Sequence, residues 1–299
     1  MKYANLHLHS TFSDGVYTPR ELCSIAKEMG YGAIALTDHE TVAGYPLLKE
    51  AAEEYGLMTI LGAEFYAEGF GQHFHIVGMD FDPTEFGMAN YLRRLTEGAY
   101  LYTYAKFEEL EKKGLTEGLT WQEICDDAEE NAWLCNEQIF ASLVKRRGYT
   151  QDLYWTYSKA FRAQKVAVER PEVPRDAADV ISLIRNAGGV AILAHPHGQT
   201  EYLPALCKIG LRGVEYDHPD LSLEDRAAVE AFTREETVYL SGGTDHTGGL
   251  GDYPFLRGDM PGARERAEKD GAYYCPLDTD VLCGVTQEEF EALRDRVYG

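Results

Sequence analysis

Two histidines separated by one residue, His7 and His9, follow a short apolar stretch near the start of the chain. In a β-strand, residues i and i+2 point to the same face, so both imidazoles should project together beyond the strand's carboxyl end. Imidazole nitrogen is a common ligand of zinc, iron and manganese. The pair therefore predicts a metal site to which other residues must contribute.

Further residues of metal-binding types follow the other stretches that read as strands. They are Asp38-His39, Glu64, His75, His195 and Asp245-His246, and Asp14 lies in the loop after the first histidine pair. Taken singly, each has an ordinary explanation, since a lone histidine is commonly packed or exposed and Asp38 could cap a helix. Active sites of α/β barrels gather at the carboxyl ends of the strands. The repeated position therefore predicts one shared site with several metal ions.

The elements that must position these residues alternate between strand and helix. Strands are predicted at 3–8, 33–36, 58–62, 74–77, 190–194, 213–216 and 238–240, and helices at 18–29, 42–55 and from 286 onward. The first and last helices open with capping boxes, Thr18 to Glu21 and Thr286 to Glu289. Strand-then-helix units of this kind predict an α/β fold with a parallel sheet and right-handed crossovers.

Residues 84–179 interrupt the alternation with a helical pattern rich in aromatic and charged side chains. A capping box at Thr120 to Glu123 separates two of its helices, and Pro171 and Pro174 indicate a linker at its end. We therefore expect residues 1–83 and 180–299 to form the domain that carries the metal site. Residues 84–179 form a helical insertion, and residues 248–285, rich in Gly, Pro and Asp, are predicted to be loop.

Composition limits the partners. The chain has 28 Lys and Arg against 50 Asp and Glu, a net charge of −22, which would repel a polymeric nucleic acid but not exclude a small phosphate compound at a metal site. No apolar run is long enough for a membrane span and no signal peptide is evident, so we expect a cytoplasmic protein with no membrane partner. The six cysteines form no Cys-x-x-Cys pair and are expected to be reduced thiols. Nothing in the sequence predicts an oligomeric state.

Seven stretches together resemble the PHP (polymerase and histidinol phosphatase) family of metal-dependent phosphoesterases. They are HLHSTFSDG (7–15), ALTDHETV (35–42), GAE (62–64), HIVG (75–78), GGVAILAHP (188–196), GVEY (213–216) and GGTDH (242–246). The resemblance implies a distorted (β/α)7, TIM-like barrel that holds two or three divalent ions. Mixed histidine and carboxylate sites suit Mn, Fe and Zn, and the sequence does not choose among these metals. The insertion resembles the lid of the small-molecule branch that includes nucleoside bisphosphate phosphatases, which implies that it covers the site.

The resemblance also implies how the ligands divide among the ions. One ion would take His7, His9, Glu64 and Asp245, and Glu64 would bridge to a second ion bound by His75 and His195. A third would take Asp14, His39 and a histidine of the last motif, here His246. Asp38, His39 and His195 are the candidates for proton transfer, and the sequence does not choose among them.

Three departures from the family pattern concern the third ion and the substrate. The last motif usually reads Asp-x-His but here reads Asp245-His246-Thr247, so the role of His246 stays open. Cys135-Asn136-Glu137 stands where the branch usually has Gly-Arg-Pro, and His197 follows the Ala-His-Pro motif where an Arg is common. His197 and His218, which follows the Gly-Val-Glu motif, are therefore candidate substrate-binding residues. Arg93 and Arg94, on the first predicted helix of the insertion, are candidates for contact with the substrate from the lid.

These observations predict a metal-dependent hydrolase of a small phosphate ester, a nucleotide or sugar phosphate that could be cyclic, attacked by a water that the ions activate. Two alternatives stay open: an amidohydrolase-like enzyme on the same kind of barrel, and a non-catalytic metal-binding module. Glu64 in the bridging position, instead of a carboxylated lysine, argues against the first. The chain has neither a Gly-x-Ser-x-Gly elbow nor a Gly-Lys-Ser/Thr phosphate loop, which argues against a serine hydrolase or a nucleotide-driven motor.

Overall fold

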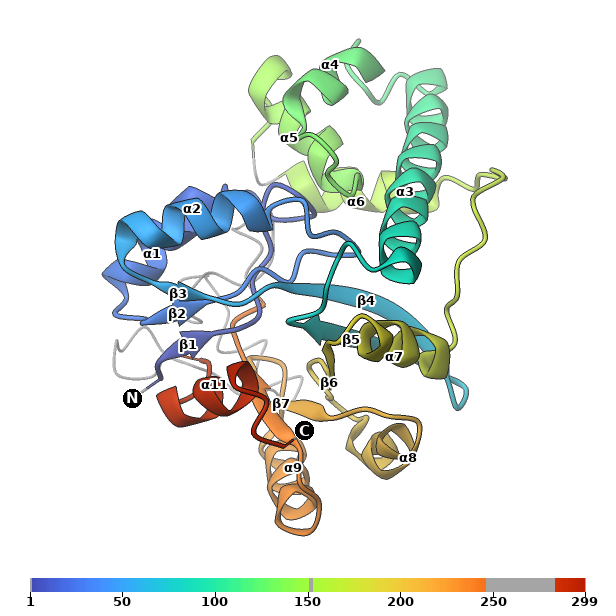
Figure 1. The fold of residues 1–299 in the computed structure, drawn as a ribbon. Coiled ribbons are helices and arrows are strands. Elements are labelled where there is room, and N and C mark those ends of the chain that lie inside the picture. Colours follow the sequence, from blue (N-terminus) through green and yellow to red (C-terminus); the bar gives the residue numbers. More distant parts are fainter. Residues whose placement is uncertain (1, 151–152, 246–282, 299) are drawn as a thin grey trace.

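The computed structural model describes residues 2–150, 153–245 and 283–298, an α/β arrangement of two β-sheets flanked by helices (Figure 1). The strands are β1 (Ala4–Asn5), β2 (Ala33–Ile34), β3 (Met58–Thr59), β4 (Gly62–Gly69), β5 (Gln72–Met79), β6 (Val190–Leu193), β7 (Gly213–Asp217) and β8 (Tyr239–Gly242). The helices are α1 (Pro19–Glu28), α2 (Tyr45–Tyr55), α3 (Phe86–Lys112), α4 (Trp121–Asp127), α5 (Asn136–Arg147), α6 (Tyr154–Ala163), α7 (Ala177–Asn186), η2 (Thr200–Tyr202), α8 (Leu203–Lys208), α9 (Leu223–Glu235) and α11 (Gln287–Arg294).

The predicted helix starts agree with the observed ones where a capping signal is strong. Thr18, Thr120 and Thr286 each accept a hydrogen bond from the backbone three residues later and complete the predicted capping boxes of α1, α4 and α11. Helix α2 begins at Tyr45, later than the predicted residue 42, because Pro46 fits only the first turn of a helix. Most of the predicted loop at 248–285 lies outside the described residues.

The strands form two sheets, of order β1-β2-β3 and β4-β5-β6-β7-β8. The predicted parallel pairing is confirmed within β1–β3 and within β6–β8, but it is wrong for β4 and β5, which pair antiparallel with each other, and for β5 with β6. Phe70 and Gly71 explain the difference. Their φ angles of 51° and 75° make a two-residue turn of the kind that matches the twist of a β-hairpin.

Backbone hydrogen bonds connect the two sheets at both edges. The pairing of Ile34 with Thr59 continues along the same two chain segments to a bridge between His39 and Glu64, so β3 and β4 belong to one extended run. At the other edge, the Leu6 amide donates to the Gly242 carbonyl at 3.0 Å, and the Asp245 amide donates to the His7 carbonyl at 3.0 Å. These contacts bring the ends of β1, β2 and β8 to the middle of the β4–β5 hairpin.

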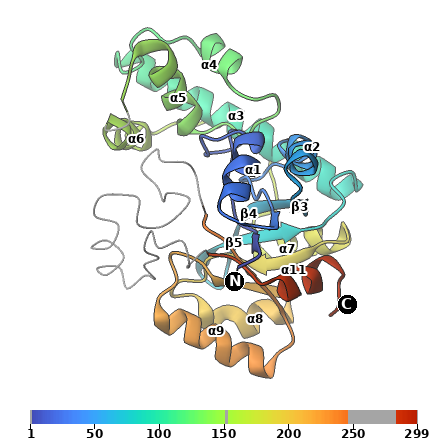
Figure 2. The same ribbon diagram turned by 90° about the vertical axis from the view of Figure 1, so that its left-hand side faces the viewer.

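The insertion consists of one long helix and a compact group of shorter ones. Helix α3 runs from the sheets to α4, α5 and α6, which lie on one side of the molecule, while α8 and α9 lie on the opposite side (Figures 1 and 2). Phe107, Ile139, Phe140 and Leu143 are among the buried residues of the insertion's own core. The helices of the insertion end at Ala163, before the end of the predicted helical pattern. Residues 164–176 form a non-helical strap that leads to α7, and α7 packs against β4, β5 and β6.

No helix in the described part of the chain combines the length and apolar character that a membrane span requires.

Candidate metal centre

Glu64 lies at the centre of the predicted site, buried on β4, with its two carboxylate oxygens facing different histidines. Its Oε1 is 2.9 Å from His75 Nδ1 and 2.9 Å from His195 Nε2. Its Oε2 is 3.2 Å from His39 Nδ1 and 3.4 Å from His9 Nε2. The carboxylate therefore has the geometry of a bridge between two groups of nitrogen ligands.

Asp245 and Asp14 extend the cluster on either side of the first histidine pair. Asp245 Oδ1 lies 3.0 Å from His9 Nε2 and 3.5 Å from His7 Nε2. Asp14 Oδ1 lies 3.2 Å from His9 Nδ1, and Asp14 Oδ2 lies 3.6 Å from His39 Nε2. The structure thus brings together eight of the predicted metal-binding residues: His7, His9, Asp14, His39, Glu64, His75, His195 and Asp245. His246 lies outside the described residues.

The buried nitrogens fit divalent ions. The Nε2 atoms of His7 and His9 are buried and form no hydrogen bond with any described residue, although buried polar atoms in proteins nearly always have a partner. Four groups of described residues that could each hold an ion share members around them: His7-His9-Asp245, His7-Glu215-His218, His9-His39-Glu64 and Glu64-His75-His195. Mixed imidazole and carboxylate donors suit Zn, Fe and Mn. The described residues therefore offer a polynuclear site for such ions.

Backbone strain and charge agree with this interpretation. His195 and Asp245 have φ angles of 26° and 51°, a region that residues other than glycine rarely adopt and that occurs at functional sites. Burial by itself would raise the pKa of Glu64, but the imidazoles of His75 and His7 hold that pKa well below its ordinary value. Against burial, the hydrogen bond and charge of Glu64 raise the pKa of His195 to about 9. The Glu64 carboxylate is therefore ionised and able to hold cations.

Glu215, on β7, orients His7, a role that the sequence did not indicate. Its Oε1 lies 2.7 Å from His7 Nδ1, and its Oε2 accepts a hydrogen bond of 2.7 Å from the His195 amide. Because a carboxylate can only accept, the proton of a neutral His7 resides on Nδ1 and Nε2 keeps its lone pair. The Gly-Val-Glu stretch at 213–215 was the available sequence signal for this residue.

His218 is buried beside the cluster with the opposite tautomer. Its Nδ1 accepts a hydrogen bond of 3.1 Å from the Asp220 amide, so the proton of a neutral ring resides on Nε2. That Nε2 faces Asp245 Oδ2 at 3.6 Å, and the His218 ring centroid is 5.5 Å from that of His7. His218, predicted as a substrate-binding residue, thus presents a donor to a candidate metal ligand.

Asp38 organises the loop that carries Asp14. Its carboxylate accepts hydrogen bonds from the Ser10 amide at 2.7 Å, the Ser10 hydroxyl at 2.7 Å and the Ser13 hydroxyl at 2.6 Å. Burial raises the pKa of Asp38, although the Ser13 hydroxyl acts in the other direction. With both oxygens already bonded, Asp38 anchors this loop, and its role in proton transfer remains a prediction.

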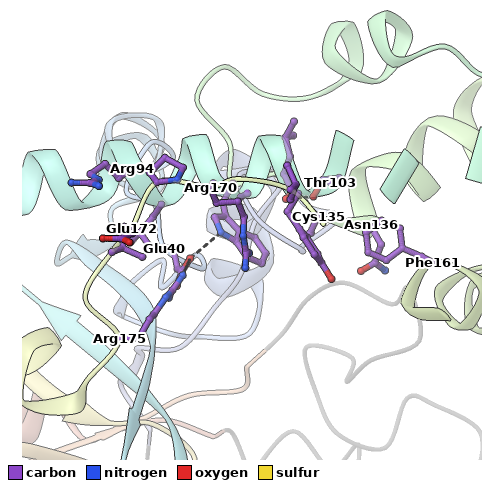
Figure 3. Close-up of a pocket in the computed structure, with 18 residues that line it drawn as sticks. Glu40, Arg94, Thr103, Cys135, Asn136, Phe161, Arg170, Glu172 and Arg175 are labelled. Carbon is purple, nitrogen blue, oxygen red and sulfur yellow. Dashed lines mark hydrogen bonds and ion pairs between the residues drawn. The ribbon is translucent and has the colours of Figure 1, made fainter. Parts of the chain in front are cut away.

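The other predicted substrate-binding residues lie apart from the metal cluster. His197 is half-exposed, and its Nδ1 is 2.7 Å from Asp225, the residue that completes the capping box of α9. Arg93 forms an exposed ion pair with Glu97 at 3.2 Å. Arg94 lines a cavity between α3 and the strap that precedes α7 (Figure 3).

Comparison with known sequences supplies the family context. The model of the PHP domain matches residues 5–172. A phosphoribosyl 1,2-cyclic phosphate 1,2-diphosphodiesterase of Eggerthella lenta is 27% identical over 261 residues, 86% of this chain and 98% of the relative. A 3′,5′-nucleoside bisphosphate phosphatase of Chromobacterium violaceum is 28% identical over 265 residues, 84% of this chain and 90% of the relative. A 5′-3′ exoribonuclease of Haemophilus influenzae is 33% identical over 197 residues, 65% of this chain and 69% of the relative.

Solved structures share the fold. A metal-dependent phosphoesterase of Bifidobacterium adolescentis superposes with a TM-score of 0.72 at 24% identity and covers 93% of this chain and 94% of its own. A protein of Chromobacterium violaceum described as an amidohydrolase superposes with a TM-score of 0.63 at 22% identity and covers 93% of this chain and 99% of its own.

Proposed function

The chain belongs to the PHP domain family, and on that premise we propose that it is a metal-dependent enzyme that hydrolyses a small phosphate ester. The observation that carries the proposal is Glu64, whose two oxygens face His75 and His195 on one side and His9 and His39 on the other. A bridging carboxylate of this kind holds two cations about 3.5–4 Å apart, which suits a clamp across a phosphoryl group. The small-molecule phosphodiesterase and phosphatase among the relatives support the same class.

The ligands divide as the family resemblance implies. His7, His9, Glu64 and Asp245 would hold one ion, and Glu64 with His75 and His195 would hold a second. Asp14 and His39 offer two ligands of a third. Bound Mn, Fe or Zn ions supply Lewis-acid polarisation of the phosphoryl oxygens and lower the pKa of a coordinated water.

Exposure indicates the side from which the ester approaches. The side chains of His7, His9 and Glu64 are at most 1% exposed, whereas His39 and His195 are each 23% exposed and His75 is 35% exposed. His39 and His195 can therefore reach a bound ester, and whichever of them does not coordinate an ion can hold the proton that the leaving oxygen needs. Glu215 fixes the His195 backbone at 2.7 Å and so keeps that imidazole in position.

The same premise extends to the architecture. We propose that the two sheets form one distorted (β/α)7 barrel, in which β3 and β4 count as a single strand and the contacts of Leu6 with Gly242 close the ring. The insertion at 84–179 then acts as a lid. Support for the lid comes from Trp133, whose ring centroid lies 5.4 Å from that of His39.

Metal-loaded protein should release phosphate from small esters, and a chelator should abolish the release. Metal analysis should find two or three ions per chain. Glu64→Gln should lower both the metal content and the rate, the rate by at least about 100-fold, because it removes the charge shared by two sites. Glu68→Gln, on the same strand but exposed, is the control and should change neither.

Three outcomes would contradict the proposal. Activity that survives the chelator would remove the metals from the reaction. Turnover of N-acyl substrates without turnover of phosphate esters would favour the amidohydrolase class. A folded protein that binds no divalent ion would favour a non-catalytic module.

A further inference from the structure

Arg175, near the end of the strap, binds a buried carboxylate in the cavity between α3 and the strap (Figure 3). Its backbone carbonyl accepts from the Glu68 amide on β4 at 2.6 Å, which fixes the base of the side chain. Its Nη1 contacts Glu40 Oε1, and its Nη2 donates to Glu40 Oε2 at 3.2 Å. Glu40 is 5% exposed, so its charge has little contact with water and depends on this guanidinium fork.

Glu40 directly follows His39, and its backbone has an unusual conformation. Its φ angle of 53° lies in the left-handed region, which is costly for a glutamate and persists only where neighbouring contacts impose it. Two contacts hold it there: the Glu40 amide donates to the Glu64 carbonyl at 2.8 Å, and the side chain is bound by Arg175. The direction in which the chain leaves His39 therefore depends on Arg175.

Trp133, from the insertion, also lines this cavity and is the third partner of Glu40. Its Nε1 donates to Glu40 Oε2 at 3.2 Å, and its ring centroid lies 5.4 Å from that of His39. Its backbone amide donates at 2.8 Å to the carbonyl oxygen of Phe12, in the loop that carries Asp14. One carboxylate thus connects the strap and the insertion to the His39 imidazole.

We infer that Arg175 is a positioning residue for the metal centre, which acts through Glu40 and so keeps His39 where this imidazole can bind an ion. The inference rests on the proposed function, since it takes from it that Asp14 and His39 offer two ligands of a third ion. That ion has the fewest ligands among the described residues and should be the weakest bound. Without the guanidinium, Glu40 would be a buried charge with no ion-pair partner among them, and it would turn toward water and release the Trp133 indole.

The weakest ion should respond to Arg175 more than the other two ions do. Glu64 is held by its place in the β4–β5 ladder, and His7 is oriented by Glu215, so neither depends on the strap. A change at Arg175 should therefore weaken one ion selectively. A general loss of stability would weaken all the ions alike.

Titration of metal-free protein with Mn²⁺, followed by calorimetry, tests the inference. Arg175→Gln should weaken the weakest ion about 10- to 100-fold, the usual cost of losing a residue that orients a ligand, and leave the others unchanged. Arg175→Lys should restore part of the loss, because lysine keeps the charge but not the fork. Arg170→Gln is the matched control and should bind all the ions as the wild type does. Arg170 lies on the same strap, over the Tyr102 ring, and forms no ion pair with any described residue.

A double variant separates positioning from stability. Glu40→Gln combined with Arg175→Gln removes both charges, so no unpaired charge stays buried, and circular dichroism should show a folded protein. It should weaken the weakest ion to the same extent as Arg175→Gln alone, because both changes break the same connection. If Arg175→Gln alone does not fold, the double variant decides by comparison with the wild type and Arg170→Gln.

Three outcomes would overturn the inference: additive losses in the double variant, equal weakening of all the ions, or a wild type that binds no third ion. Failure of metal-loaded wild type to hydrolyse any phosphate ester would instead overturn the proposed function. The selective loss of one ion in the titrations would then still assign the positioning role to Arg175.

Discussion

At the scale of single residues, the second nitrogen of each imidazole decides what the first can do. Glu215 accepts from His7 Nδ1 and leaves Nε2 free to bind a cation, whereas the Asp220 amide donates to His218 Nδ1 and leaves Nε2 protonated. The two ring centroids lie 5.5 Å apart. His7 presents an unprotonated nitrogen on the side of Asp245, whereas His218 presents an N–H group there. His7 is thus suited to be a ligand, and His218 is suited to orient one.

Replacing His218 tests this distinction. His218→Leu should lower metal affinity and turnover about 10- to 100-fold, the usual cost of losing a residue that orients a ligand, because Asp245 Oδ2 loses its facing donor. His218→Gln should restore much of both, since its amide N–H can take the position of Nε2–H. Isothermal metal titration and steady-state kinetics measure the two effects. If ¹⁵N spectra of ¹¹³Cd-loaded protein showed cadmium coupling to His218 Nε2, this residue would be a ligand and the tautomer argument would be wrong.

The sequence predicted these residues to different extents. His7, His9 and Asp245 were found because they lie shortly after β1 and β8, at the carboxyl ends of parallel strands, where active-site residues of α/β folds gather. Glu64 and His75 were found by residue type, although they lie within β4 and β5 and not after a strand. They reach the site because β4 and β5 form an antiparallel hairpin, whose mid-strand residues lie beside the ends of the parallel strands. The tautomer of His218 depends on a backbone amide whose direction no residue pattern encodes.

At the scale of elements, the Gln138 side chain helps to attach helix α5 to the loop that carries Asp14. Gln138 donates to the Ser13 carbonyl oxygen and accepts from the Cys135 amide at 2.8 Å, both within the buried base of the insertion. Gln138→Ala should therefore lower the free energy of unfolding by about 1–3 kcal/mol, since it leaves the buried Cys135 amide without this partner and the Ser13 carbonyl oxygen with only the weak Cys135 thiol donor. Urea titration monitored by circular dichroism measures this. Gln122→Ala, which removes an exposed contact on α4, is the control, and an equal loss there would contradict the assignment.

Helices α4 and α5 are also joined by ion pairs that depend on pH. The Arg146 guanidinium, helped by Lys145, holds the pKa of Asp127 well below its ordinary value. A carboxyl group whose pKa is lower in the folded protein than in the unfolded chain stabilises the fold. This stabilisation is complete above the pKa of the group in the unfolded chain, near 4, and is lost as the pH falls toward its pKa in the folded protein. Below about pH 4, the α4–α5 contact should weaken by roughly 0.2–1 kcal/mol.

Hydrogen exchange of the α4 and α5 amides between pH 7 and pH 3 provides the measurement, corrected for the intrinsic exchange rate at each pH. Asp127→Asn should make the protection of these helices less sensitive to acid than in the wild type, and the remaining sensitivity comes from Glu123, which pairs with Arg147. If the wild-type and variant helices lost protection in parallel, the acid sensitivity would come from other groups.

At the scale of the whole molecule, the net charge of −22 and the cavity beside the metal centre favour small substrates over polymers. The relatives include an exoribonuclease, so the exclusion of nucleic acid remains a prediction for this chain.

The helical insertion was predictable from its 3.6-residue pattern, and so were the strands at either side of it. The way the two sheets join was not, because it depends on backbone contacts between residues such as Leu6 and Gly242 that are far apart in the sequence.

Salt dependence separates the two substrate classes. Like charges repel a polyanion over roughly the 10 Å screening length of 0.1 M salt, and added salt shortens that range. Cleavage of a 5′-phosphorylated RNA oligomer should therefore be slower than that of a mononucleotide at 20 mM NaCl and should rise several-fold at 200 mM. The mononucleotide rate should change less, because its smaller charge is repelled less. A protein built to bind RNA through positive side chains would show the opposite trend, with cleavage of the oligomer falling steeply as salt rises. That trend, measured as kcat/KM for both substrates with the same metal-loaded preparation, would refute the preference for small esters.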